Sequence, residues 1–307
     1  MDGARISTPR SKCEALGIAD SVDPQRSPRS RGEAPWRLTF TRTLIYVILV
    51  TIAIVQAFPL VWMIVTSVKD SHEVFNTVLP SQINWRNFPR AWFAMNFPGH
   101  LGNSLYVTSL TVALVVAFAT PAAYAFARYR FPGREVVFYT FIGAMMIPPQ
   151  AILIPMFQFL KTLHLLNSLT GLALSYVGGG VAFVVFLMRT FFLSLPGELG
   201  DSARIDGCND FQVFWHIYLR LARPGMATVV IIQSLYTWNE FMFANTLIMS
   251  PGKKTVQSAV FQAVGQYGTD YTALCSGLII ALIPVVIVYL ALQRQFISGL
   301  TAGALKG

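Results

Sequence analysis

The sequence predicts an all-α protein with six helices that cross a membrane, and three observations support this fold class. The 307-residue chain is 54% hydrophobic and only 12% charged, which is about half the charged share of a soluble domain. Its apolar residues form runs of about 20 or more, the length of helix that crosses a hydrocarbon layer about 30 Å thick. Its basic residues are distributed unequally between the two sides of these runs, as in membrane proteins.

The apolar runs are helical spans because they show no period of two, which a transmembrane β-barrel requires. About 40 mostly polar residues precede the first run and no small-residue cleavage site follows it, which excludes a signal peptide. The six predicted spans are 43–67, 104–127, 136–158, 168–193, 226–248 and 275–296.

The basic residues predict the orientation. If the N-terminus is cytoplasmic, 17 of the 23 lysine and arginine residues lie on the inner side and 6 on the outer side. The positive-inside rule therefore predicts that both termini are cytoplasmic. The net charge of +9 reflects this topology. We expect no nucleic-acid partner, because the basic residues lie at membrane edges and not on one folded face.

The chain divides into a tail and a membrane domain. Residues 1–36 are rich in Ser, Pro and Arg with few large apolar residues, which predicts a disordered cytoplasmic tail. Residues 37–307 form the predicted transmembrane domain. The spacing of Cys13, Cys208 and Cys275 predicts neither a disulfide within the chain nor a metal site.

Several spans contain residues that disturb helices. A proline removes a backbone donor and kinks its helix, and glycine allows close helix approach. These residues indicate either ordinary packing or broken helices around a shared transport cavity. They are Pro121, Pro148, Pro149, Pro155, Gly178, Gly179, Gly180 and Pro284.

The inner segment 194–225 is long and patterned. Glu198 follows a proline–glycine pair and opens one short helix, Gly207 interrupts it, and Asn209 with Gln212 forms a capping-box pair that begins a second helix. The pattern indicates either a docking element or a helix that lies on the bilayer or on its own bundle. The second helix has one apolar face, made of Phe211, Phe214, Trp215, Tyr218 and Leu219.

This segment resembles the cytoplasmic "EAA" loop of ABC importer permeases. The resemblance rests on Leu199-Gly200-Asp201-Ser202-Ala203-Arg204-Ile205-Asp206-Gly207, followed by Phe214-Trp215-His216-Ile217-Tyr218-Leu219. Ala203, Gly207, Ile217 and Leu219 match the family pattern in register. Asp201 and Ser202 stand where the family has Glu and Ala, and Arg220 stands where Pro is common.

Further motifs resemble the carbohydrate-uptake branch of this family, similar to the second permease subunit of maltose-type importers. They occur in order between about residue 40 and the end of the chain. They are Met146-Ile147-Pro148-Pro149-Gln150, Ile154-Pro155, Thr237-Trp238-Asn239-Glu240-Phe241 and the terminal run from Gly299 to Gly307.

The resemblance implies a type I ABC importer permease fold in the bacterial cytoplasmic (inner) membrane. It implies translocation of a carbohydrate that an extracytoplasmic sugar-binding protein delivers. The implied partners are a homologous second permease, two ATPase subunits, this binding protein and the lipid bilayer. We expect no enzymatic activity, catalytic residue, metal or cofactor in this chain, because ATP and Mg belong to the ATPase subunits.

The resemblance also implies roles for particular residues. The loop would dock in a cleft of one ATPase subunit and transmit its closure to the spans. The expected ATPase-coupling residues are Glu198, Asp201, Ala203, Asp206, Gly207, Phe211, Phe214 and Trp215. In this family the outer loop 250–274 can reach the binding protein, and the expected contacts are Gln257, Gln262, Gln266 and Tyr267.

Glu240 is the acid placed deepest in a span, beside Trp238 and Asn239. A carboxylate in a membrane is costly unless it is paired or faces water. The three residues therefore indicate either a substrate pathway or a structural hydrogen bond between helices, and both interpretations are open.

Two alternatives to a sugar importer are compatible with parts of the sequence. One is an ABC importer permease for a solute other than a sugar. The other is an ion-coupled secondary transporter, which predicts several intramembrane charges and inverted repeats. Glu240 alone is deeply placed and the chain has no clear repeat, which disfavours the second. The sequence does not name the sugar.

Overall fold

The structure is a computed structural model that describes residues 35–94, 96–266 and 270–304, and every regular element in these ranges is helical. It divides into two units, residues 1–60 and 61–307. The tail predicted at 1–36 lies outside the described residues except for Pro35 and Trp36, which begin the first helix.

The first unit contributes residues 35–60 of helix α2 (Pro35–Ser67). The part from Arg42 to Ser67 is apolar throughout and its most apolar window has no buried residue. Large apolar side chains such as Tyr46 and Ile54 are exposed around the helix. A helix that is apolar on all sides is suited to lipid, in agreement with the predicted span 43–67.

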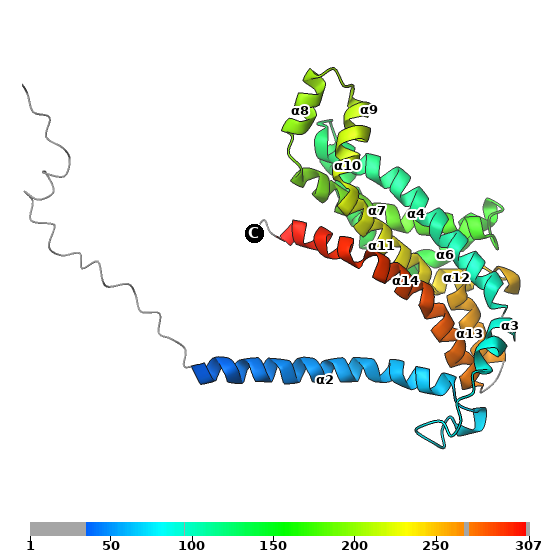
Figure 1. The fold of residues 1–307 in the computed structure, drawn as a ribbon. Coiled ribbons are helices and arrows are strands. Elements are labelled where there is room, and N and C mark those ends of the chain that lie inside the picture. Colours follow the sequence, from blue (N-terminus) through cyan, green and yellow to red (C-terminus); the bar gives the residue numbers. More distant parts are fainter. Residues whose placement is uncertain (1–34, 95, 267–269, 305–307) are drawn as a thin grey trace, which may run out of the picture. The chain divides into compact units, whose positions relative to one another are not determined.

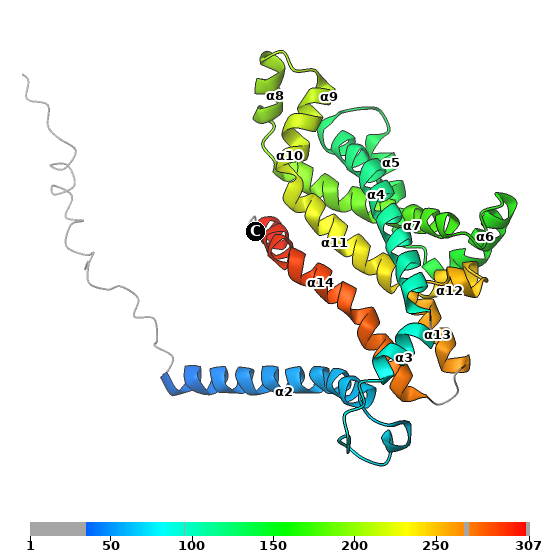
Figure 2. The ribbon, with the colours of Figure 1, turned by 45° about the vertical axis from the view of Figure 1, so that its right-hand side comes forward.

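The second unit is built on a pair of long helices (Figures 1 and 2). Helices α4 (Phe97–Arg128) and α7 (Leu169–Ser194) pack together along much of their length. Helix α11 (Arg223–Asn239) packs on both, and α14 (Tyr271–Ala304) packs on α11. Helices α4, α7 and the first part of α14 are long and apolar enough to cross a membrane, which agrees with three predicted spans.

The predicted span 136–158 is two helices and not one. Helix α5 (Arg134–Met145) and helix α6 (Pro149–Thr162) meet at an angle of 99°. The break falls at Pro148 and Pro149, which lack the N–H that a continuous helix needs. Proline also forces the residue before it into an extended conformation, and Pro148 has φ −63° and ψ 131°.

The predicted span 226–248 is also interrupted. Helix α11 ends at Asn239, and the short helix α12 (Met242–Leu247) begins after Glu240 and Phe241. Within the ranges that the structure describes, four single helices could cross a membrane, and the bent pair α5–α6 makes five if it counts as one span.

The remaining helices lie at the two ends of the long ones. A segment of short helices, α8 to α10, projects at one end, and α3 and α13 lie at the other (Figures 1 and 2). Besides α12, the short elements outside the projecting segment are η1 (Ser71–Glu73), α3 (Asn87–Ala94), η3 (Pro251–Lys253) and α13 (Val256–Gln266).

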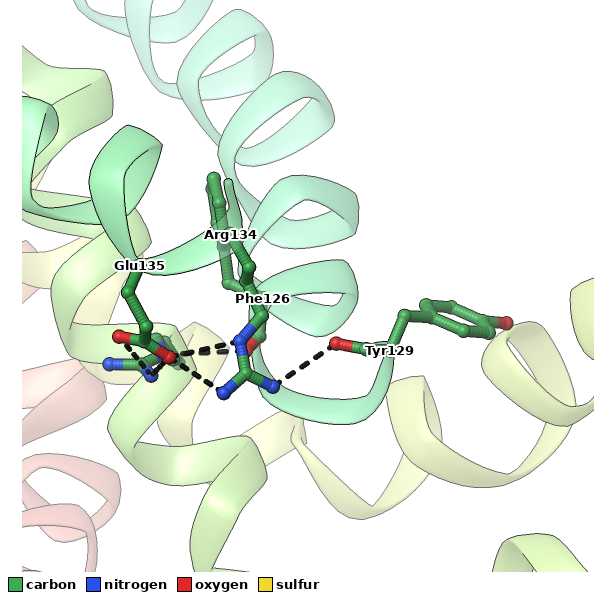
Figure 3. A network of polar contacts seen from close by, with 5 residues as sticks. Phe126, Tyr129, Arg134 and Glu135 are labelled. Carbon is green, nitrogen blue, oxygen red and sulfur yellow. Dashed lines mark hydrogen bonds and ion pairs between the residues drawn. The ribbon is translucent and has the colours of Figure 1, made fainter. Parts of the chain in front are cut away.

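A charged cluster fastens α5 to α4 and α7 (Figure 3). Oε1 of Glu135 lies 2.6 Å from Nη2 of Arg134 and 3.2 Å from Nη2 of Arg189 in α7. The same arginines donate to backbone carbonyls, Arg134 to Tyr129 at 3.1 Å and Arg189 to Phe126 at 3.4 Å. The half of the broken span that contains α5 is therefore held to its neighbours by charge as well as by packing.

A second polar junction joins α3 to the start of α14. Oδ1 of Asp270 accepts hydrogen bonds from the Ala273 amide at 3.1 Å and the Thr272 hydroxyl at 2.7 Å, and Oδ2 lies 3.1 Å from Nη2 of Arg90 in α3. Burial acts to raise the pKa of Asp270. The hydrogen bonds from Thr272 and Ala273 and the charge of Arg90 outweigh it, so the pKa lies below its usual value.

We expect Asp270→Asn to lower the free energy of unfolding by about 1 kcal/mol, because it weakens both a helix cap and an ion pair. The pKa of Asp270 is lower in the folded than in the unfolded protein. Its contribution is therefore complete above about pH 4 and is lost as the pH falls through the folded-state pKa. Thermal unfolding in detergent should show a Tm difference from wild type at neutral pH that shrinks toward about pH 3.

The matched control is Asp206→Asn, which removes the charge of an exposed carboxylate outside this junction. An equal loss of Tm in this control, or a Tm difference for Asp270→Asn that does not depend on pH, would contradict the role of the junction.

Candidate functional site

The projecting segment is a helical hairpin. It consists of α8 (Glu198–Ile205), a turn, α9 (Asp210–Gln212), the π-helical turn η2 (Val213–Tyr218) and α10 (Leu219–Leu221). This confirms the predicted order of helix, glycine turn and helix. The π-helical turn was not predicted. We call residues 198–221 the coupling hairpin, after the role that the sequence resemblance implies for them.

The turn of the coupling hairpin depends on Gly207 and on a helix cap. Gly207 has φ +90°, a backbone conformation that costs little only for glycine. The predicted capping box is present. The backbone N–H of Gln212 donates to Oδ1 of Asn209, and the backbone N–H of Asn209 donates to Oε1 of Gln212, both at 2.9 Å. The second helix therefore begins at a defined residue directly after the turn.

Arg204 connects the two arms of the coupling hairpin. Its Nη1 lies 2.9 Å from Oδ1 of Asp201 in α8, and its Nε lies 3.0 Å from Oδ1 of Asp210 in α9. These groups are exposed, so each ion pair stabilises the hairpin only modestly. Sequence reasoning singled out Asp201 but not Arg204, although the spacing of three between them is a readable helical pair.

The base of the coupling hairpin is packed against the membrane helices. The ring of Tyr124 in α4 has centroid distances of 4.9 Å to Phe214 and 5.2 Å to Tyr218. The guanidinium of Arg128 lies 4.6 Å from the centre of the Tyr218 ring. Its Nη2 also donates to the carbonyls of Phe192 at 2.7 Å and Leu195 at 2.6 Å, at the end of α7. The hairpin is thus joined to α4 and α7 together.

The apolar face predicted for the second helix is divided between the core and the surface. Phe214 and Tyr218 are only 8% and 2% exposed, because Tyr124 and its neighbours cover them. Phe211 and Trp215 are 71% and 53% exposed. Their rings are stacked with centroids 6.1 Å apart and an interplanar angle of 13°. We call these two residues the exposed aromatic pair.

The other expected coupling residues also fall into two groups. Glu198, Asp201, Asp206 and Gly207 are exposed, whereas Ala203 is buried in the same cluster as Phe214. Phe214 and Ala203 therefore belong to the packed base of the hairpin, and they do not share the exposed surface expected for a partner contact.

Glu240 lies at the break between α11 and α12 with its carboxylate fully engaged. Its Oε1 accepts a hydrogen bond from the Phe243 amide at 2.9 Å, and its Oε2 accepts one from the Ala244 amide at 3.1 Å. The hydroxyl of Tyr176 in α7 donates to the same Oε2. The carboxylate therefore caps α12 and links it to α7.

A cavity of about 620 Å³ lies between the α5–α6 break, the middle of α7 and α11. Its lining includes Met145 and Pro149 at the break, Gly179 in α7, and Gln233 and Tyr236 in α11. Helix-breaking residues that the sequence singled out thus border a shared cavity. Trp238, Asn239 and Glu240 are not among the residues that line it; Tyr176, which holds Glu240, is.

The expected binding-protein contacts lie on or after α13. Gln257 donates to Oδ1 of Asn239 at 3.4 Å, which places α13 beside the end of α11. Gln262 is half-buried on α13 and Gln266 ends that helix. Tyr267 lies outside the described residues.

Comparison with known proteins places this architecture in a family. The family model for the binding-protein-dependent transport system inner membrane component matches residues 116–301. The probable ABC transporter permease protein YurM of Bacillus subtilis (strain 168) is 32% identical over 301 residues, which cover 97% of this chain and 99% of the relative.

Other relatives have names that specify sugars. The arabinooligosaccharides transport system permease protein AraQ of the same organism is 33% identical over 262 residues, covering 83% of this chain and 92% of the relative. Relatives at 30% identity are named for diacetylchitobiose, starch degradation products and galactooligosaccharides.

A solved structure shares the fold. A chain in the crystal structure of a bacterial ABC transporter involved in the import of the acidic polysaccharide alginate has a TM-score of 0.76 and 25% sequence identity. The match covers 84% of this chain and 97% of the other. The chain described here is therefore a member of the family of binding-protein-dependent transport system inner membrane components.

Proposed function

We propose that this chain is the transmembrane permease subunit of an ATP-driven ABC importer for a carbohydrate. The observation that carries the proposal is the coupling hairpin, which is packed at its base and bears an exposed aromatic pair at one end of the apolar helices. The relatives named for sugar transport support a carbohydrate as the solute. The chain is a transport subunit and not an enzyme.

The proposal includes six spans with both termini in the cytoplasm of a bacterium. Two observations support it: the basic residues cluster on the side of the coupling hairpin, and α11 with α12 supplies an interrupted helical pair in the region of the fifth predicted span. Arg128, Arg134 and Arg189 belong to this inner side, where they also hold α4, α5 and α7 together.

The coupling hairpin docks in a cleft of one of two ATPase subunits, which bind ATP and Mg. The exposed aromatic pair is the anchor, since stacked aromatic side chains give a large and rigid apolar contact. Closure of the ATPase subunits then moves the hairpin, and the contacts of Arg128 and Tyr218 carry that movement to α4 and α7. A homologous second permease completes the pathway, and an extracytoplasmic sugar-binding protein delivers the solute to the side of α13.

The proposed function is tested by sugar uptake in cells that express this chain with its partner permease, ATPase and binding protein. The probes are arabinotriose, diacetylchitobiose, maltotriose and galactotriose, one for each sugar class named among the relatives. ATP-dependent uptake of one of them supports the proposal. If none of the sugars is taken up, uptake of a non-sugar solute would replace the proposal by an ABC importer for that solute. Uptake that depends on an ion gradient would replace it by a secondary transporter.

We expect Phe211→Ala and Trp215→Ala each to weaken ATPase docking by about 2 kcal/mol or more, which is about 30-fold in affinity, because aromatic anchors dominate interfaces of this kind. The measurement is the amount of ATPase subunit that co-purifies with the permease, followed by the ATP hydrolysis that the loaded binding protein stimulates.

The matched control for these variants is Phe93→Ala. Phe93 is as exposed as Phe211, at 77%, and lies in α3 at the other end of the unit. Retention of the ATPase by the Phe211 and Trp215 variants at the level of this control would show that the exposed aromatic pair is not the anchor.

We expect Gly207→Ala to reduce stimulated ATP hydrolysis strongly while the membrane helices stay folded. Alanine at φ +90° is strained by about 1–2 kcal/mol, and the turn relieves this strain by changing the angle between the arms of the hairpin. Gly102→Ala is the control, because Gly102 is exposed, has open space around it and has no positive φ. Equal hydrolysis in the two variants would argue against the turn as the determinant of coupling.

A further inference from the structure

The cavity between α5–α6, α7 and α11 has the size of a ligand site and no charged lining. Its volume of about 620 Å³ lies within the ordinary range of small-molecule pockets. None of the described residues that line it is Asp, Glu, Lys, Arg or His. A charged solute would have no counter-charge in this wall, and burying an unpaired charge is costly. The cavity is therefore suited to a neutral ligand.

Two glycines enlarge this cavity, although no neighbouring atom of the chain requires a glycine at either position. Gly178 and Gly179 lie within α7, where each glycine costs about 1 kcal/mol relative to alanine. A Cβ added at either would meet no atom within 4 Å. Gly180 differs, because a Cβ there would lie 2.8 Å from the carboxamide of Gln233. Close packing accounts for Gly180, whereas Gly178 and Gly179 leave volume that faces open space.

The wall has few polar groups, and two of them are held in place by hydrogen bonds. Tyr176 is fixed by its hydrogen bond to Glu240, and Nε2 of Gln233 lies 3.4 Å from the Thr237 hydroxyl. The Tyr236 side chain is 49% exposed and its hydroxyl makes no hydrogen bond with the residues that the structure describes. An acyl chain in the cavity would leave the Tyr236 hydroxyl without a partner, which is unfavourable. A ligand with hydroxyl groups would satisfy it.

Aromatic rings complete the wall. Phe183, Tyr236 and Phe243 border the same space as Gln233. A sugar ring presents apolar C–H faces and polar hydroxyl edges, so it matches a wall of aromatic rings with a phenol and a carboxamide between them.

We propose that this cavity is a solute subsite that takes one ring of a neutral carbohydrate, with Tyr236 and Gln233 as the residues that determine specificity. The inference rests on the proposed function as a carbohydrate permease. It places a solute contact in this subunit and at residues other than Trp238, Asn239 and Glu240. Glu240 acts on the subsite indirectly, as a positioning residue that holds Tyr176.

The test uses the complete transporter and whichever of the four sugar probes the wild type takes up. Tyr236→Phe keeps the ring and removes the hydroxyl, so KM for uptake should rise about 3- to 10-fold, the effect of losing one neutral hydrogen bond. Gly179→Leu fills the cavity and should reduce uptake at least about tenfold. ATP hydrolysis stimulated by the loaded binding protein should stay within about twofold of wild type in Tyr236→Phe.

The matched control for Gly179→Leu is Gly102→Leu, at an exposed glycine of α4 that has no atom within 4 Å of an added Cβ and does not line the cavity. Uptake by Gly179→Leu equal to that of this control overturns the proposal, as does an unchanged KM in Tyr236→Phe. Loss of the partner permease during purification of Gly179→Ala also overturns it, in favour of a helix-packing role. Absence of uptake by the wild type for every sugar counts against the proposed function and not against the subsite in particular.

One further outcome separates a sugar from a lipid chain. Mass spectrometry of the purified complex measures phospholipid that stays bound. Displacement of a bound phospholipid by Gly179→Leu, with sugar uptake unchanged, would identify the cavity as a lipid site and overturn the proposal.

Discussion

The contacts of Arg128 are the interaction on which the attachment of the coupling hairpin to the membrane helices depends. This residue ends α4, donates to the carbonyls of Phe192 and Leu195 at the end of α7, and lies over the ring of Tyr218. One side chain thus joins two membrane helices and the base of the hairpin. The buried rings of Tyr124 and Phe214 pack closely beside it and hold the base of the hairpin against α4.

The bilayer imposes a second constraint, because each backbone polar group at a helix break must find a partner within the protein. The two breaks meet this constraint differently. Pro148 and Pro149 have no N–H to satisfy. At the other break, the carboxylate of Glu240 accepts hydrogen bonds from two backbone amides in the first turn of α12, those of Phe243 and Ala244. The acid in the span is therefore explained by the break beside it, and its bond to Tyr176 connects that break to the cavity wall.

Much of the fold was predictable because its signals are local. The spans near α4, α7 and α14 follow from the length of the apolar runs, and the turn of the hairpin follows from Gly207 with Asn209 and Gln212. The 99° bend between α5 and α6 was not predictable, because two prolines indicate that a helix breaks but not the angle at which it continues.

The parts of the site that depend on distant segments could not be predicted either. The division of the apolar face of the hairpin depends on Tyr124, which lies far earlier in the chain and covers Phe214 but not Phe211. The cavity is formed by several helices, among them α5, α6, α7 and α11, so nothing in the sequence around Tyr236 and Gln233 indicates that they line a cavity. The sequence marks Glu240 as a lone acid in a span, but its partner Tyr176 is visible only once α7 and α12 are placed side by side.

The π-helical turn at Val213–Tyr218 sets the direction in which the side chains after it point relative to those before it. A π turn holds one more residue than an α turn, and each residue of an α-helix advances the side chains by about 100° around the axis. Removal of one residue here would restore α winding and rotate Tyr218 and Leu219 away from their present direction relative to Phe211. The direction in which the buried Tyr218 points relative to the exposed Phe211 thus depends on this one π turn. An insertion or deletion within the turn would point the exposed surface in a different direction while leaving the rest of its composition unchanged.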